Sequence, residues 1–217
     1  MKAERSIMAA VILVLSLTVV SVPAGASLMT IGTADYNSST YNLIYDNDSP
    51  FGSIVYLDYT SDTGKWSRRV NWASSLNDPG VISNYVLNSG YSMNWGGSSW
   101  RLPISTQDSG TYQTWSEMGH LWYTELGNPT GSTPTTGVFS NLQLVPYWSG
   151  TESNVSDAWY FSINNGGQSA TSKINGYYAL AVRFGQLETS TVPEPSTYVL
   201  MCLSLGVVGY ARKRMVK

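Results

Sequence analysis

Long, mainly apolar runs without charged residues lie near both ends of the chain, whereas the middle alternates between short apolar segments and polar turns. The first run extends from Ile7 to Val22, behind the basic residues Lys2 and Arg5, and the small residues Ala24-Gly25-Ala26 follow it. A basic start, an apolar run of this kind and an Ala-x-Ala site together predict a secretory signal peptide that is cleaved after Ala26. We therefore assign residues 1–26 to a signal peptide.

The segment between the two ends, residues 27–191, is expected to form one domain with a sizeable core. Segments rich in β-branched and aromatic residues, or alternating between apolar and polar positions, predict strands at Asn42–Asp46, Ile54–Tyr59, Ala158–Ile163 and Tyr178–Phe184. Apolar positions at helical spacing predict helices at Trp66–Asn77 and from Thr114 to Gly127. Helices set between early and late strands predict an α+β domain.

The second helix has recognisable sequence signals at both of its ends. Thr114-Trp115-Ser116-Glu117 matches a capping box, which places its start at Thr114. Gly127 is a natural C-terminal cap. The apolar face between these ends consists of Met118, Leu121, Trp122 and Leu126. This helix should therefore pack on the core through that face.

Charge and cysteine content change the picture of the domain. The whole chain has 12 basic and 14 acidic residues, and its ends hold six and two of these, which leaves a net charge of −6 for residues 27–191. That balance argues against nucleic acid, or another anionic polymer, held by bulk charge. The single cysteine, Cys202, lies in the second apolar run. The domain therefore has no disulfide despite an oxidising destination, and its stability must come from packing.

The second apolar run, Tyr198–Tyr210, lies between Pro193-Glu194-Pro195 and the basic cluster Arg212-Lys213-Arg214. At ~1.5 Å per residue, a helix of this length falls short of the ~30 Å hydrocarbon core, which favours a transient anchor. The three parts, in this order, resemble the PEP-CTERM sorting signal of bacteria that make exopolysaccharide. We assign residues 192–217 to this signal, with its short transmembrane helix. The resemblance implies processing by an exosortase; a single-pass tail that is never cut is the alternative.

A second resemblance covers most of the domain, from about Leu43 to Arg183. The ordered series is Trp100-Arg101-Leu102-Pro103, Glu117-Met118-Gly119-His120-Leu121, Tyr147-Trp148-Ser149-Gly150-Thr151-Glu152, Ala158-Trp159-Tyr160-Phe161 and Tyr178-Ala179-Leu180-Ala181-Val182-Arg183. It resembles the Lcl C-terminal domain family, which is related to C-type-lectin-like folds. Many relatives carry a cysteine near the position of Ala181, so any disulfide of theirs is missing here. The resemblance implies a lectin-like fold with a role in surface adhesion or ligand display.

Catalytic and metal-binding chemistry are not favoured by the spacing of the polar residues. His120, the only histidine, follows Glu117 by three residues, so the two could share a helix face, but a catalytic zinc site needs a third ligand. The oxygen-rich segment Asp46-Asn47-Asp48-Ser49 fails the EF-hand pattern, because Phe51 stands where glycine is required. We expect a structural histidine, a solvated acidic turn and no cofactor, with calcium at Asp46 and Asp48 as the alternative.

The late loops mix flat aromatic rings with amide groups, a combination that suits carbohydrate or a protein interface. By alternation, Trp159 and Tyr178 are expected to be buried, and Tyr160 and Tyr177 to be exposed. The candidate ligand-binding residues are Tyr147, Trp148, Tyr160, Asn164, Asn165, Gln168, Asn175 and Tyr177.

These patterns predict an exported cell-surface or extracellular-matrix protein that is processed by an exosortase. The first hypothesis is a non-catalytic carbohydrate-binding or adhesive module whose partner is exopolysaccharide or a surface glycan. The second is a structural matrix protein that binds other proteins. A hydrolase is third, because the available carboxylates single out no catalytic pair.

Overall fold

The computed structural model describes residues 28–189, which contain β-sheet with short helical segments. The signal peptide at 1–26 and the sorting signal at 192–217 lie outside the described residues. Within residues 28–189, no helix is both long enough and apolar enough to cross a membrane. The domain is mostly β-sheet with few helices, which is compatible with the α+β prediction. The C-type-lectin-like fold itself stays a prediction.

The largest sheet has five strands in the order β4-β1-β2-β3-β9. Their bounds are β1 Met29–Tyr36, β2 Ser39–Asp46, β3 Ile54–Leu57, β4 Ile82–Leu87 and β9 Ala181–Phe184. All neighbouring strands in this sheet are antiparallel. The sheet thus joins the first third of the described chain to its end, and β9 confirms only the second half of the strand predicted at Tyr178–Phe184.

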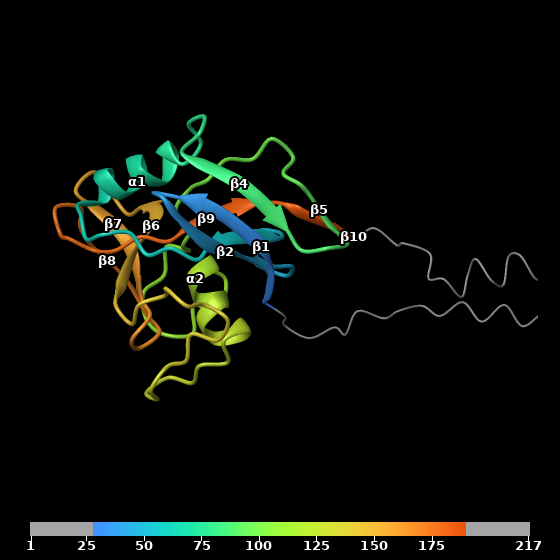
Figure 1. The fold of residues 1–217 in the computed structure, drawn as a ribbon. Coiled ribbons are helices and arrows are strands. Elements are labelled where there is room, and N and C mark those ends of the chain that lie inside the picture. The colour runs from blue at the N-terminus through green and yellow to red at the C-terminus, as the bar shows by residue number, and fades with distance from the viewer. Residues whose placement is uncertain (1–27, 190–217) are drawn as a thin grey trace, which may run out of the picture.

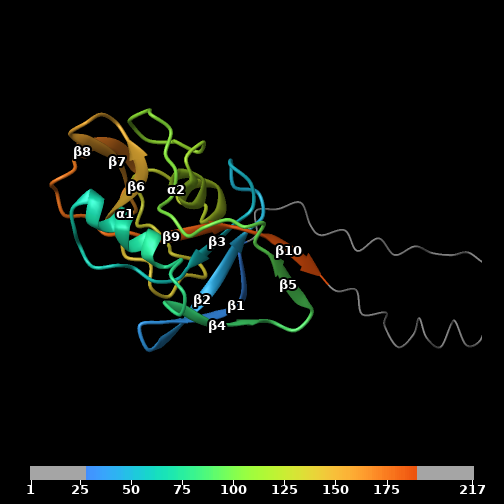
Figure 2. The ribbon, with the colours of Figure 1, turned by 90° about the horizontal axis from the view of Figure 1, so that it is seen from above.

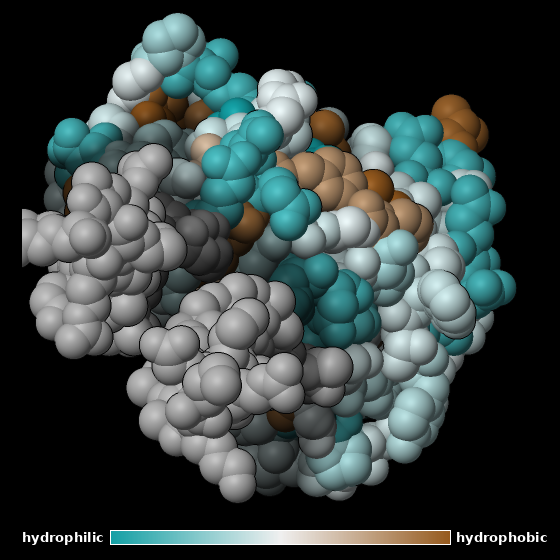
Figure 3. Space-filling model, turned by 90° about the vertical axis from the view of Figure 1, so that its right-hand side faces the viewer, coloured by the Kyte–Doolittle hydropathy of each residue, from teal (hydrophilic) through white to brown (hydrophobic). Residues whose placement is uncertain are grey.

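Two smaller sheets flank the large one. β6 Pro146–Glu152, β7 Asp157–Ser162 and β8 Gly167–Ser172 form an antiparallel three-stranded sheet. β5 Tyr91–Asn94 and β10 Gln186–Thr189 form a two-stranded ribbon. This ribbon lies on the side of the domain where β1 begins and β10 ends (Figures 1 and 2). The surface on that side is mostly hydrophilic to neutral, with a short apolar band (Figure 3).

The helical segments confirm one prediction and correct another. α1 spans Trp66–Ser75, inside the predicted range. α2 spans Glu117–His120 and continues as the π-helix η1, Leu121–Glu125. The predicted start at Thr114 is wrong, because the N-cap is Ser116, whose hydroxyl accepts a hydrogen bond from the Gly119 amide. The predicted C-terminal end of this helix is confirmed, since Gly127 has a positive φ of 60°.

The centre of the five-stranded sheet, β3 and the second half of β2, is buried on both faces. One face places Ile44, Ile54 and Tyr56 against the predicted apolar face of α2 and η1, which consists of Met118, Leu121, Trp122 and Leu126. The opposite face places Leu43, Tyr45, Val55 and Leu57 in a second core that includes Leu76, at the end of α1. α1 and α2 therefore cover opposite sides of the sheet (Figure 1). This arrangement brings the end of β2 next to the end of α2.

Candidate functional site

Four side chains that can ligate a metal meet where β2 ends beside α2 and η1. Asp46 is the last residue of β2, and Asp48 lies in the turn toward β3. His120 ends α2, and Glu125 ends η1. One ligand atom from each residue lies within 4.8 Å of those of the other three. We call these four residues the acidic-histidine cluster.

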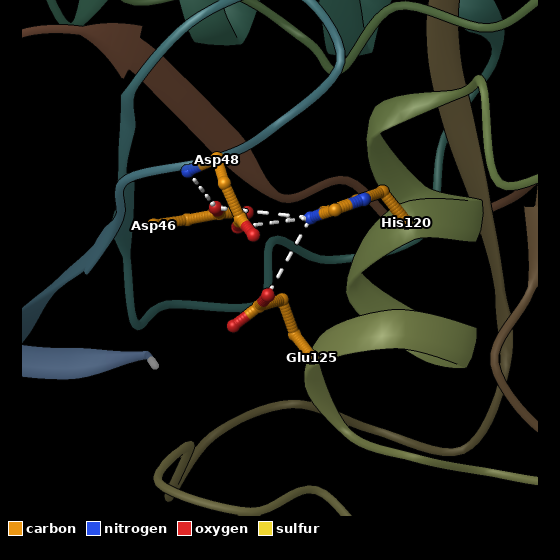
Figure 4. Close-up of side chains that lie close together, drawn as sticks. All are labelled: Asp46, Asp48, His120 and Glu125. Atoms are coloured by element: carbon orange, nitrogen blue, oxygen red, sulfur yellow. Dashed lines mark hydrogen bonds and ion pairs between the residues drawn. The ribbon is translucent and has the colours of Figure 1, made fainter. Parts of the chain in front are cut away.

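The geometry of the acidic-histidine cluster centres on one nitrogen (Figure 4). The Nε2 atom of His120 lies 3.3 Å from Oδ1 of Asp48, 3.5 Å from Oε1 of Glu125 and 4.0 Å from Oδ1 of Asp46. An imidazole nitrogen carries at most one proton and donates one hydrogen bond. A proton on Nε2 therefore cannot serve all three carboxylates together.

The π-helical turn accounts for the meeting of His120 with Glu125. In an α-helix, residues five apart point in different directions, because each residue turns the chain by about 100°. A π-turn closes its hydrogen bond one residue later, as the Leu126 amide does by donating to the Leu121 carbonyl. The extra residue in the turn brings positions 120 and 125 onto one side of the helix.

Burial separates the members of the cluster. The side chains of Asp46 and Glu125 are 0 % exposed, that of His120 is 10 % exposed and that of Asp48 is 51 % exposed. Asp46 accepts hydrogen bonds from the Asp48 amide and from the Tyr56 hydroxyl. Neither carboxylate oxygen of Glu125 has a hydrogen-bond partner among the described residues beyond the ion-pair contact with His120. The predicted solvated acidic turn is therefore wrong for Asp46, because the end of β2 is buried beneath α2.

The electrostatics of the cluster favour added positive charge. Burial, reinforced by the negative charge of Glu125, raises the pKa of Asp46 to about 7. Burial by itself would lower the pKa of His120, but the ion-pair contact with Glu125 and the charge of Asp46 outweigh it and raise that pKa. Burial acts the other way at Asp48, where bonding to His120 wins and lowers the pKa. The raised pKa values of Asp46 and His120 therefore favour proton uptake by these two groups.

Glu117, which the sequence pairs with His120, has a different partner. Its carboxylate forms a two-pronged ion pair with Arg101, with N–O distances of 2.6 and 2.7 Å. The Ile104 amide donates a third hydrogen bond, at 2.7 Å. The Arg101 guanidinium also lies over the Phe184 ring, 4.4 Å from its centre. Glu117 therefore ties the segment at 101–104 to the start of α2.

The structure divides the sequence-predicted binding residues into buried and accessible groups. Tyr147, Trp148 and Gln168 are 0, 0 and 2 % exposed, so these side chains are buried in this conformation and their contact with a ligand stays a prediction. Trp148 donates to the Gly64 carbonyl, and Gln168 donates to carbonyls at 106 and 108, so both brace loops. The expected burial of Trp159 is confirmed at 7 % exposure.

Tyr160, Tyr177 and Asn175 lie on a half-buried surface of the three-stranded sheet. The ring centres of Tyr160 and Tyr177 are 4.9 Å apart, and Asn175 donates to Thr171 on β8. Asn164 and Asn165 are exposed in the turn between β7 and β8, where Asn165 accepts a hydrogen bond from the Gly167 amide. The predicted residues therefore occupy two separate places, the turn and this sheet surface.

A concave pocket lies over Tyr147 and was not predicted. It has a volume of about 330 Å³ and is lined by Tyr41, Tyr59, Thr60, Ser61, Asp62, Asn141, Gln143 and Tyr178. The Tyr147 hydroxyl lies under it, 2.8 Å from the Thr60 hydroxyl and 2.8 Å from the Gln143 amide that donates to it. Tyr178 is half-buried rather than buried, contrary to the alternation, and faces this pocket. We call it the tyrosine pocket.

The sequence contained the parts of both sites without their arrangement. Asp46, Asp48, His120 and Glu125 are each conspicuous as polar residues beside apolar segments. Their meeting depends on a strand–helix contact across more than 70 residues and on a π-turn, and periodicity reveals neither. The tyrosine pocket likewise combines residues from β2, the segment after β3, the segment before β6 and the segment before β9.

A PEP-CTERM protein-sorting motif matches residues 191–214. The match confirms the assignment of Pro193, Glu194 and Pro195 to a sorting signal, and the motif implies that the chain is exported, transiently held at its C-terminal end and processed by an exosortase. No curated protein and no solved structure matches the chain. The resemblance of residues 43–183 to the Lcl C-terminal domain family therefore stays a prediction.

Proposed function

We propose that the exported domain is a non-catalytic carbohydrate-binding or adhesive module of the cell surface or extracellular matrix, and that the tyrosine pocket holds the glycan. The observation that supports this most is the pocket itself, which combines tyrosine rings with amide and hydroxyl groups in one concave surface. Pockets with an aromatic lining and a few polar groups are typical of small-ligand sites. Sugar rings stack on aromatic faces through C–H groups, while their hydroxyls bind amides.

The rings of the tyrosine pocket are held in place before any ligand arrives. Tyr59 packs edge-on against Tyr41, with ring centres 5.0 Å apart, and against Tyr36 at 4.9 Å. Below them, Thr60 donates to the Asn141 carbonyl at 2.6 Å. Buried Asp58 accepts hydrogen bonds from the amides of Ser140 and Asn141, which fixes the loop that carries Gln143. Rigid sites lose less entropy on binding, so this bracing favours affinity.

The polar groups of the pocket favour a binding role over hydrolysis. Among the described residues that line it, Asp62 is the single carboxylate. Glycoside hydrolysis uses a pair of carboxyl groups, held ~5–10 Å apart on either side of the scissile bond. The net charge of −6 over residues 27–191 further favours a neutral or cationic glycan over an acidic one.

The test is binding of the purified full-length protein to exopolysaccharide from the producing strain, measured with Gln143→Ala and Tyr178→Ala. We expect saturable binding that each substitution weakens about tenfold, because each removes one lining group. Tyr160→Ala serves as the matched control and also tests the sequence-predicted surface. Unchanged binding in both pocket variants together with loss in Tyr160→Ala would move the site to the three-stranded sheet. Absence of saturable binding by folded wild-type protein would overturn the proposal.

A second candidate function, binding to other matrix proteins, is favoured by one exposed segment. Tyr112 and Trp115, just before α2, are 65 % and 74 % exposed. Tyr112 stacks on Tyr123 with ring centres 4.7 Å apart, and it holds a positive φ of 60°. Exposed, rigid aromatic side chains are common anchors in protein interfaces. Loss of matrix retention in Trp115→Ala, with glycan binding unchanged, would support this second function.

A further inference from the structure

We propose that the acidic-histidine cluster is a binding site for a divalent first-row transition metal, with zinc as the best-fitting ion. The site is separate from the tyrosine pocket and does not depend on the function proposed for it. Its ligands would be one carboxylate oxygen each from Asp46, Asp48 and Glu125, together with Nε2 of His120.

The first argument is the state of Glu125. Its side chain is completely buried, and both of its oxygens lack a hydrogen-bond partner in the described chain. A buried carboxylate without donors carries a large desolvation penalty unless a cation offsets it. The carboxylate points into the cluster, toward His120 (Figure 4). A metal ion at that point would bind the oxygen that no protein donor reaches.

The second argument is the number of acceptors around His120. Three carboxylates face one nitrogen, which can give a proton to one of them at a time. A metal ion accepts electron pairs from all four groups together, so one ion can bind all three carboxylates and the imidazole, whereas one proton cannot. The Tyr56 hydroxyl, which donates to Asp46, would then act as an outer-shell group that orients this ligand.

The donor set and the spacing select the class of metal. Zinc ligands at ~2.0–2.1 Å from a tetrahedral ion lie about 3.3–3.4 Å from one another. Two of the Nε2–oxygen distances are 3.3 and 3.5 Å, and the third, to Asp46, is 4.0 Å. Since the four ligand atoms lie within 4.8 Å of one another, the carboxylates would move inward to complete a tetrahedral set around an ion. Calcium instead takes six to eight oxygen ligands. An imidazole with three carboxylates therefore favours zinc or a similar transition ion.

The burial of the ligand side chains determines how a metal ion would reach the site and which segments it would join. Asp48 is half exposed, which opens the cluster to solvent on one side, while the other three side chains are interior. A bound ion would join the β2–β3 turn to the end of α2 and to η1. In a domain without a disulfide, such a link would replace a covalent one between two segments distant in sequence.

The test uses full-length protein, first treated with chelator and then titrated with Zn²⁺, Mn²⁺, Ca²⁺ or Mg²⁺ in calorimetry and thermal unfolding. We expect one zinc ion per chain, a higher melting temperature, and much weaker binding of calcium and magnesium. Asp46→Asn and Glu125→Gln should each lower zinc affinity at least about 100-fold, because each removes a ligand. Asp78→Asn, an exposed carboxylate in the turn after α1, should leave the affinity unchanged.

A second measurement keeps the proposal testable if a variant fails to fold. Because His120 is the only histidine, its imidazole ¹⁵N signals are unambiguous in NMR of the wild-type chain. Stoichiometric zinc should shift the Nε2 resonance to that of a metal-bound nitrogen and leave Nδ1 less affected. Titration with no change at Nε2, or stoichiometric zinc binding that persists in Glu125→Gln, would overturn the proposal. Calcium binding in preference to zinc would also overturn it.

Discussion

Two buried glutamates on one helical segment differ in every contact they make. Glu117, at the start of α2, receives two hydrogen bonds from Arg101 and one from the Ile104 amide. Glu125, at the end of η1, has no hydrogen-bond donor in the described chain and faces His120 with two further carboxylates. Both side chains are 0 % exposed. Burial alone therefore does not distinguish a carboxylate with a structural role from one in a candidate binding site. The presence of hydrogen-bond donors around the carboxylate does.

The difference indicates how the fold uses the two residues. The carboxylate of Glu117 is fully partnered within the fold, because it pairs with a cation and accepts a hydrogen bond from the amide of the neighbouring loop. The carboxylate of Glu125 has no such donors, and its negative charge adds to burial in raising the pKa of Asp46. The contribution of Glu117 to stability should not depend on a ligand, whereas that of Glu125 should depend on metal.

The largest expected effect on stability comes from removing the Glu117 carboxylate. Glu117→Ala should lower the free energy of unfolding by about 3–5 kcal/mol, because it leaves Arg101 without its counter-charge and the Ile104 amide without an acceptor. Denaturant unfolding of the two proteins measures this difference. The loss should be the same in zinc and in chelator; a loss seen only with zinc would mean that Glu117 belongs to the metal site.

The next effect is a pH dependence of the chelated protein. The folded pKa values of Asp46 and His120 lie above their unfolded values, so folding takes up protons and stability should decrease as the pH rises from 5 to 8. The groups that face this pair are Asp48, Glu125 and Tyr56; the pKa of Asp48 is lowered, so this residue works in the opposite direction, but only in more acidic solution. We expect a loss on the order of 2–3 kcal/mol from Asp46, absent in Asp46→Asn.

Glu125→Leu should change the stability of the protein by a smaller amount, and the sign of the change should depend on whether zinc is present. In chelator, replacing an unpartnered buried carboxylate by an apolar side chain should leave stability unchanged or raise it by about 1 kcal/mol. With zinc, the same variant should lose the stabilisation that the ion gives the wild type. Melting temperatures with and without zinc measure both. A destabilised variant in chelator would show that Glu125 has a structural role of its own.

The smallest effect should come from the exposed member of the cluster. Asp48→Asn should change the stability of the chelated protein by less than about 0.5 kcal/mol, since half of its side chain is in solvent. Its zinc affinity should nevertheless decrease. Comparison of unfolding and zinc titration for this variant separates ligation from folding, and a large loss of stability without metal would contradict the expected role.

Local sequence patterns predicted the helices and strands better than the contacts between them. The apolar face of the second helix was predicted residue by residue, because Met118, Leu121 and Trp122 follow helical spacing and pack where expected. Its first residue was misplaced, since Thr114 and Ser116 are both good caps and only tertiary packing selects the second. At Gly119, a Cβ atom would lie 2.0 Å from the Gln113 carbonyl oxygen, so the preceding loop packs directly on the helix.

The candidate sites depended more heavily on tertiary structure. Tyr147 and Trp148 were assigned to a binding face because the late loops mix aromatic rings with amide groups, and that mixture could not show that the three-stranded sheet buries both rings. The acidic turn at Asp46 and Asp48 was predicted to be solvated, because nothing in its own sequence indicates that α2 covers it. The sorting signal was predictable in full, since its recognition depends on a contiguous stretch of sequence.

The two-stranded ribbon has a mechanical consequence. The described chain leaves the domain through β10, whose four residues pair with β5, and Thr189 pairs with Tyr91. Tension arriving from a C-terminal attachment therefore acts on four residue pairs before it reaches β9, which is held in the large sheet by β3. Detachment of β10 would release about 13 Å of chain, at ~3.3 Å per residue, and would remove only Leu187 from its packing against the second core. The ribbon thus gives the domain a short extensible tether that yields under load before the fold does.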